Sequence, residues 1–216
     1  MFENYKITLA SNSPRRKELL TGLDVDFTVE PAKDDKEVID EFVPQYLVPQ
    51  SIAKHKSESF HRNLEDNEIL ITADTLVFCP KIKKPYGIEL TDNEDIHQML
   101  ENCEILGKPK DKEDAIRILS KLSGNTHYVL TGVVLRSNKT TRTFTATSEV
   151  TFKDLSISEI EYYIDKYKPF DKAGSYGVQE WIGYIAITSI KGSFYNVMGL
   201  PIQRVYSELK IMTSED

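Results

Sequence analysis

Residues 69–78 form the apolar run Ile69-Leu70-Ile71-Thr72-Ala73-Asp74-Thr75-Leu76-Val77-Phe78. A run so rich in Ile, Leu, Val and Phe predicts a buried strand. Asp74 lies within it, and a buried carboxylate is costly unless it is hydrogen-bonded, paired or bound to a metal. Two interpretations follow: a catalytic or metal-binding group at the end of a core strand, or a charge at a strand end that bonds to local backbone amides.

Strands and helices alternate along the chain around this run. Strands are expected near residues 5–10, 26–30, 68–78, 126–136, 141–152 and 183–190, and helices near 14–21, 50–64, 112–123, 157–167 and 200–210. Asn138-Lys139 would turn one strand of the 126–152 pair back on the other, which predicts a hairpin instead of a crossover. The expected fold class is therefore α/β, with a mixed sheet and flanking helices.

Composition predicts a globular protein of one domain, or one domain with two lobes, over its 216 residues. A net charge of −7 argues against a nucleic-acid partner, so a phosphate ligand would have to meet a local cluster of cations. Two cysteines, Cys79 and Cys103, do not make a disulfide framework. No stretch has the apolar length of a membrane span and no secretory signal is visible, so the cytoplasm is the expected location.

The segment Ser11-Asn12-Ser13-Pro14-Arg15-Arg16 predicts a polar turn that leads from a strand into a helix. Ser13 suits the N-cap and Pro14 the first helical position. Two arginines in the first turn oppose the helix dipole, and a bound phosphate would resolve that conflict. The alternative is a pair of solvated surface arginines.

Together these segments resemble the Maf family of nucleoside triphosphate pyrophosphatases. The residues that carry the resemblance run in order along nearly the whole chain: 11–16 (SNSPRR), 73–75 (ADT), 107–109 (GKP), 171–179 (DKAGSYGVQ) and 192–201 (GSFYNVMGLP). The resemblance implies an elongated sheet with two lobes around a cleft, as in related ITPase-like folds. It also implies hydrolysis of a nucleoside triphosphate to the monophosphate and pyrophosphate.

The resemblance implies a role for particular residues of this chain. The expected catalytic residues are Asp74, Glu37, Lys56 and Lys108, with Mg²⁺ or Mn²⁺ held by Asp74 and Glu37. Asp35 is an alternative to Glu37 as the second acid, and Lys172 is either a further phosphate contact or structural. The expected substrate-binding residues are Ser11, Arg15, Arg16, Thr75 and Gln179.

The substrate expected from the resemblance is dTTP or UTP, with modified pyrimidine nucleotides also open. The family subgroup that acts on dTTP and UTP has Arg, Thr and Gln at the positions of Arg15, Thr75 and Gln179. The alternative function is a non-catalytic nucleotide-binding regulator of septum formation. A P-loop nucleotidase is disfavoured, because the chain has no Gly-x-x-x-x-Gly-Lys-Ser/Thr stretch.

Residues 80–106 form an insertion that the resemblance does not explain. Residues 92–103 predict a short helix with Ile96, Met99 and Leu100 facing inward. The insertion is interpreted either as a surface excursion without catalytic importance, or as a lid or a contact in a homodimer. No second histidine lies at ligand spacing from His97, so histidine-bound metal is set aside.

Overall fold

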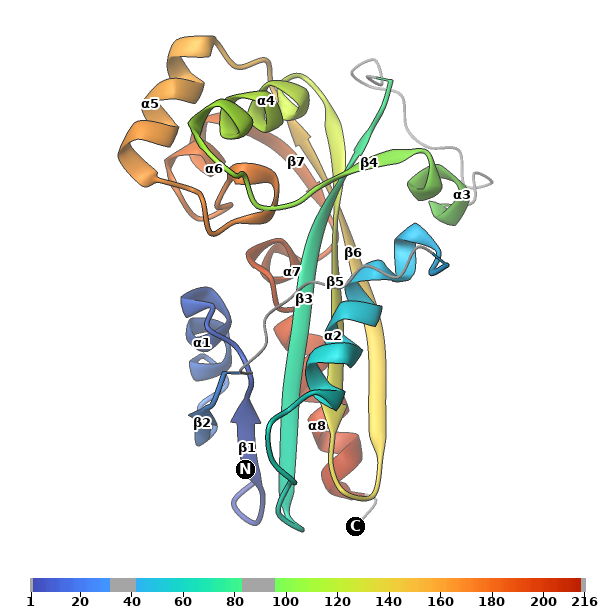
Figure 1. Cartoon of the computed structure of the whole chain (residues 1–216). Coiled ribbons are helices and arrows are strands. Elements are labelled where there is room, and N and C mark those ends of the chain that lie inside the picture. Colours follow the sequence, from blue (N-terminus) through green and yellow to red (C-terminus); the bar gives the residue numbers. More distant parts are fainter. Residues whose placement is uncertain (1, 32–41, 83–95, 215–216) are drawn as a thin grey trace. The chain divides into compact units, whose positions relative to one another are not determined.

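The computed structural model describes residues 2–31, 42–82 and 96–214 (Figure 1). The strands are β1 (Lys6–Leu9), β2 (Phe27–Val29), β3 (Glu68–Pro80), β4 (Cys103–Leu106), β5 (Thr126–Arg136), β6 (Thr141–Phe152) and β7 (Ile187–Lys191). The α-helices are α1 (Pro14–Thr21), α2 (Val48–Glu58), α3 (Ile96–Glu101), α4 (Lys112–Leu122), α5 (Ile157–Tyr167), α6 (Trp181–Ala186), α7 (Phe194–Met198) and α8 (Ile202–Ser214). Two 3-10 turns, η1 (Gln45–Leu47) and η2 (Ala173–Ser175), complete the described elements.

The described strands form one seven-stranded mixed sheet in the order β2-β1-β3-β5-β6-β7, with β4 also paired to β3. β1 runs parallel to β2 and β3, whereas the pairs β3–β4 and β6–β7 are antiparallel. The turn between β5 and β6 is closed by a hydrogen bond from the Ser137 amide to the Thr140 carbonyl (2.9 Å). The predicted α/β class, mixed sheet and 126–152 hairpin are therefore confirmed.

Several predicted boundaries are wrong for identifiable reasons. Residues 183–186 belong to helix α6 and only 187–191 to β7, because this short apolar stretch suits either state. Helix α2 ends at Glu58. Within the predicted insertion the described part contains α3 and β4, and Leu100 faces inward while Ile96 is exposed. Glu37, Asp35 and residues 83–95 lie outside the described residues.

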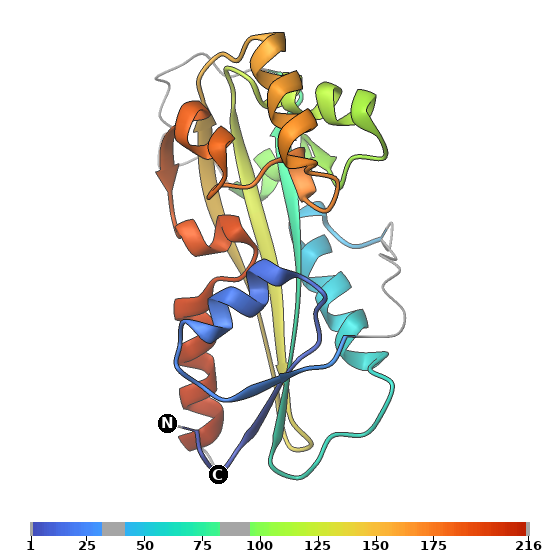
Figure 2. The same ribbon diagram turned by 90° about the vertical axis from the view of Figure 1, so that its left-hand side faces the viewer.

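The chain divides into two compact units. Unit 1 comprises residues 1–75, 131–146 and 199–216, and unit 2 comprises residues 76–130 and 147–198. Within unit 1, helices α2 and α8 cover opposite faces of the sheet (Figures 1 and 2). Helix α8 buries one face made of Ile202, Val205, Leu209 and Met212, as its three- and four-residue spacing requires.

Helix α2 lies close against strand β5 at Gly132. A Cβ placed on Gly132 would lie 2.3 Å from the Gln50 backbone nitrogen and 2.4 Å from the Pro49 carbonyl carbon. Only glycine permits this approach of the two backbones. On its inner side α2 buries Ile52, Ala53 and Lys56.

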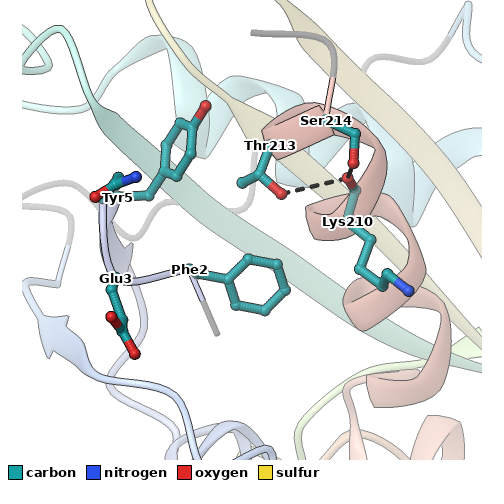
Figure 3. Close-up of a pocket in the computed structure, with 7 residues that line it drawn as sticks. Phe2, Glu3, Tyr5, Lys210, Thr213 and Ser214 are labelled. Carbon is teal, nitrogen blue, oxygen red and sulfur yellow. Dashed lines mark hydrogen bonds between the residues drawn. The ribbon is translucent and has the colours of Figure 1, made fainter.

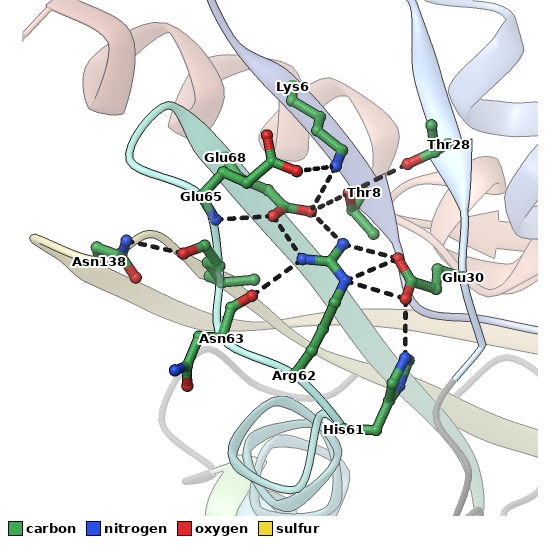
Figure 4. Close-up of polar contacts among 11 residues, drawn as sticks. Lys6, Thr8, Thr28, Glu30, His61, Arg62, Asn63, Glu65, Glu68 and Asn138 are labelled. Carbon is green, nitrogen blue, oxygen red and sulfur yellow. Dashed lines mark hydrogen bonds and ion pairs between the residues drawn. The ribbon is translucent and has the colours of Figure 1, made fainter.

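An ion-pair network ties β1 and β3 to the segment that follows β2 (Figure 4). Glu68 is fully buried, and both its oxygens accept hydrogen bonds from Arg62, at 2.7 and 2.8 Å. Thr8 donates to the same carboxylate, and Arg62 also donates to Glu30. The Arg62 guanidinium holds the pKa of Glu68 at about 2, against 4.5 for an ordinary glutamate.

Unit 2 contains its own apolar core. Helix α4 begins at the N-cap Asp111 and buries Ala115, Ile118, Leu119 and Leu122. Helix α5 begins with a capping box of Ser156 and Glu159 and buries Ile160, Tyr163 and Ile164. Among the described residues, no helix has the length and apolarity that a membrane span needs.

Candidate active site

Asp74 and Lys56 form a buried ion pair in unit 1. Lys56 Nζ donates to Asp74 Oδ1 over 2.8 Å, and the residues are 7% and 4% exposed. Asp74 lies in the middle of β3, not at its end. Side chains alternate along a strand, so Thr72 shares its face, and Thr72 Oγ1 donates to the Ala53 carbonyl of α2 (2.7 Å). The same helix that supplies Lys56 is thus fastened to β3 beside Asp74.

Arg16 holds the backbone on both sides of Asp74. Its Nη1 donates to the Ala73 carbonyl (2.8 Å), its Nη2 to Thr75 Oγ1 (3.1 Å) and its Nε to the Gly199 carbonyl (2.8 Å). Thr75 Oγ1 also lies 3.0 Å from Thr131 Oγ1. The Arg16 fork therefore joins α1, β3 and the start of the last segment of unit 1.

The turn before α1 forms as predicted. Ser13 is the N-cap and accepts a hydrogen bond from the Arg16 amide. Ser11 is buried, and its hydroxyl accepts from the Ser13 amide (3.2 Å) and from Arg16 Nη1 (3.5 Å). Arg15 is half-buried in the first turn of the helix. Unit 1 thus contains six of the predicted site residues: Ser11, Arg15, Arg16, Lys56, Asp74 and Thr75.

Unit 2 contains the two others that are described, Lys108 and Gln179. Lys108 is exposed in the loop after β4, and the carbonyl of Gly107 accepts from the Gly174 amide (3.1 Å). Gln179 follows η2 and is half-buried, while its Oε1 atom is fully buried and has no hydrogen-bond partner among the described residues.

Lys172, the additional candidate, is buried in unit 2. Its Nζ lies 2.8 Å from Asp171 Oδ1 and 3.2 Å from Glu180 Oε1. These ion pairs favour the structural interpretation of Lys172 over direct phosphate contact.

The hydroxyl of Tyr176, in the same loop, lies 2.8 Å from His127 Nε2. Burial lowers the pKa of His127 to about 3, so this histidine is neutral at physiological pH. It acts as a packing and hydrogen-bonding residue beneath the loop.

The donor set of unit 1 suits Mg²⁺ or Mn²⁺ better than a histidine- or thiolate-bound metal. Asp74 supplies a buried carboxylate, and Mg²⁺ is usually bound by one or two carboxylates together with substrate phosphates and water. Across the part of the chain that the structure describes, no three His, Cys, Asp or Glu side chains are grouped as a metal cage. The buried carboxylate of Asp74 is therefore the one described group among the expected metal ligands that could contribute to such a site.

A surface hollow elsewhere in unit 1 contains none of the predicted site residues (Figure 3). It lies between the N-terminal segment and α8, and Thr213 and Ser214 at its edge donate their hydroxyl hydrogens to backbone carbonyls of that helix. Its lining residues are Phe2, Glu3, Asn4, Tyr5, Lys210, Thr213 and Ser214. The hollow is therefore separate from the candidate site residues around Asp74.

Comparison with known proteins shows which family the chain belongs to. Residues 6–212 match the Maf-like protein family. The chain belongs to the Maf family. It is 46% identical to a dTTP/UTP pyrophosphatase of Bacteroides thetaiotaomicron, over 96% of each chain, and 47% identical to one of Porphyromonas gingivalis, over 96% of this chain and 94% of that one.

Among solved structures, the Staphylococcus aureus Ham1 protein aligns with a TM-score of 0.43 and 16% identity, covering 69% of this chain and 72% of that one. Sequence similarity, not this alignment, therefore places the chain in the Maf family.

Sequence reasoning missed several neighbours of the candidate site residues. Tyr163 and Glu180 contact the loop of Gln179, and Gly132 sets the position of α2. Tyr163 lies on α5 with the spacing of a core residue, and Glu180 has the appearance of an ordinary loop acid. The capping box predicted the start of α5, but no local signal showed which loop its inner face would contact.

Proposed function

We propose that this Maf family member hydrolyses dTTP and UTP to the monophosphates and pyrophosphate. The observation that carries the proposal is the buried ion pair between Asp74 of β3 and Lys56 of α2, in a chain 45–47% identical to several curated relatives that are named dTTP/UTP pyrophosphatases. The alternative, a non-catalytic regulator of septum formation, has no use for a buried carboxylate in an apolar strand paired with the ammonium of a neighbouring helix.

In the proposed reaction a water molecule attacks the α-phosphorus of the nucleotide. The bond between the α-phosphorus and the oxygen that bridges to the β-phosphorus breaks, and pyrophosphate leaves. Asp74 accepts the proton of the attacking water, and Lys56 Nζ, 2.8 Å from Asp74 Oδ1, holds that carboxylate in place. A divalent ion, with Asp74 and Glu37 as its proposed protein ligands, would neutralise phosphate charge.

Binding and base selection are assigned to the remaining predicted residues except Arg16, whose guanidinium donates to Gly199, Ala73 and Thr75. Arg15 and Lys108 are proposed phosphate contacts, since both carry cationic side chains at the surface of their unit. Ser11 and Thr75 are proposed substrate contacts on the α1 side of β3. Gln179 is proposed to read the pyrimidine, because a carboxamide pairs with the edge that uracil and thymine share.

The proposal is tested by measuring both pyrophosphate and orthophosphate from dTTP, UTP, CTP and purine triphosphates, with Mg²⁺ or Mn²⁺ and with excess chelator. We expect pyrophosphate from dTTP and UTP, and loss of activity in chelator. Asp74→Asn should lower kcat by about a hundred- to ten-thousand-fold. The control is Asp66→Asn, an exposed aspartate in the same unit, which should retain full turnover. Orthophosphate as the product, or equal turnover of the two variants, would refute the proposal.

A further inference from the structure

A chain of polar contacts between side chains fastens the loop that carries Gln179. Lys172 Nζ lies 3.2 Å from Glu180 Oε1, and the Tyr163 hydroxyl donates to Glu180 Oε2. The same hydroxyl accepts a hydrogen bond from the Gly177 amide (3.0 Å). Tyr163 is fully buried on α5, so a rigid helix holds both sides of the loop through one oxygen atom.

The residues on either side of Gln179 are thereby fixed. The Glu180 amide donates to the Gly177 carbonyl (3.0 Å), and the Gly183 amide donates to the Glu180 carbonyl (2.8 Å). A Cβ on Gly177 would lie 2.7 Å from the Glu180 carboxyl carbon, so this carboxyl group packs directly on the loop backbone. The backbone at Gln179 consequently has little freedom to turn its side chain elsewhere.

The orientation of Gln179 leaves an acceptor in need of a donor. Gln179 Oε1 is buried and has no hydrogen-bond partner among residues 2–31, 42–82 and 96–214. A buried acceptor without a donor is unfavourable, and a ligand N–H at that point would remove the penalty. Uracil and thymine present such a donor at N3, whereas cytosine presents an acceptor there.

We propose that Tyr163, Glu180 and Lys172 are positioning residues that hold Gln179 Oε1 as the acceptor for the N3–H of a uracil or thymine base. The inference rests on the proposed function and deepens it, because it names the groups that set base selectivity. These three residues act through Gln179 and do not touch the nucleotide.

The test is Tyr163→Phe, which keeps the buried ring and removes only the hydroxyl. The matched control is Tyr162→Phe on the same helix. Tyr162 is exposed, and among the described residues its hydroxyl oxygen accepts a hydrogen bond from Lys166 alone. We expect Tyr163→Phe to lower kcat/KM for dTTP and UTP by about 10- to 100-fold, as for loss of a hydrogen bond to a charged group. The CTP rate should change by less than about threefold, and Tyr162→Phe should match the wild type.

Two further measurements separate positioning from general loosening of the fold. Combining Tyr163→Phe with Gln179→Glu should alter selectivity no more than Gln179→Glu alone, because residues that act through one another are not additive. Hydrogen exchange at the Gly177 amide should be faster in Tyr163→Phe than in the wild type and Tyr162→Phe.

Equal losses for all three nucleotides, additive effects in the double variant, or unchanged selectivity would overturn the positioning role. Wild-type protein that releases no pyrophosphate would instead overturn the proposed function itself. The two failures are therefore told apart by the wild-type arm of the same assay.

Discussion

Replacing Glu68 by glutamine should expose how strongly the Arg62 network stabilises unit 1. The Glu68 carboxylate accepts hydrogen bonds from Arg62, from Thr8 Oγ1 (2.5 Å) and from the Glu65 amide (3.0 Å). The Arg62 hydrogen bonds contribute most to lowering the pKa of Glu68 from 4.5 to about 2, against the opposing effect of burial. That difference of about 2.5 units, at about 1.4 kcal/mol per unit, corresponds to roughly 3 kcal/mol of stability at pH 7.

The sign of the pH dependence follows from the lowered pKa. A carboxylate whose pKa is depressed by folding stabilises the native state above the unfolded pKa near 4.5. That stabilisation is lost as pH falls toward the folded pKa of about 2. At pH 3 less than half of the roughly 3 kcal/mol should remain.

The assay is urea unfolding of the wild type and Glu68→Gln between pH 7 and pH 3. We expect the variant to be less stable by about 3 kcal/mol at pH 7, and the difference to shrink by more than half at pH 3. The control is Glu65→Gln, an exposed partner of Lys6 that should cost less than about 1 kcal/mol. A difference that stays constant with pH, or a Glu68→Gln variant as stable as Glu65→Gln, would refute the reasoning.

Three further predictions concern the candidate site. Lys56→Met should lower the free energy of unfolding, measured in urea, by about 3–5 kcal/mol and abolish pyrophosphate release. The double variant Lys56→Met/Asp74→Asn should regain stability but not activity. Arg16→Lys keeps the positive charge but loses the forked guanidinium hydrogen bonds, so kcat should fall at least about tenfold with a smaller change in KM. A large rise in KM with a smaller change in kcat would instead indicate direct phosphate binding. Gly132→Ala should cost about 1–3 kcal/mol and lower kcat, because its Cβ would push the Gln50 backbone and α2 away; an unchanged Tm would contradict this.

The sequence predicted most elements because their signals are local. The turn before α1 has a serine N-cap and a proline, and α5 has a capping box, so both helices begin where expected. β4 was missed because its sequence, Cys-Glu-Ile-Leu, is too short to show a period and is a strand only through its pairing with β3. The helix–strand boundary at Ala186 was missed because apolar residues continue across it.

The candidate site could be predicted in its residues but not in all of its contacts. Asp74 stood out because a carboxylate contradicts its apolar surroundings, and the family motifs supplied Lys56. No sequence pattern showed that Arg16 would donate to the Ala73 carbonyl, or that Lys172 would lie between two carboxylates. Such contacts depend on the tertiary packing of segments far apart in the chain.

The hydrogen bonds of Arg16 indicate its role at the candidate site. Arg16 already directs three of its nitrogens to acceptors on β3, α1's preceding turn and Gly199. A phosphate would have to compete with carbonyl oxygens held at 2.8 Å, and drawing the guanidinium away would release the backbone on both sides of Asp74. We therefore predict that Arg16 positions the backbone around Asp74 and does not bind phosphate, which Arg16→Lys tests.

The Asp74–Lys56 pair is better explained by chemistry than by stability. Apolar residues of similar size would fill the same space, and replacing a buried ion pair in this way is often neutral or stabilising by about 1–4 kcal/mol. The rest of β3 from Ile69 to Cys79 is largely apolar, so such a replacement would suit its surroundings. Strand β3 and helix α2 nevertheless keep a carboxylate and an ammonium 2.8 Å apart, as the proposed catalytic role of Asp74 requires. Recovery of stability without activity in the double variant is the outcome this argument requires.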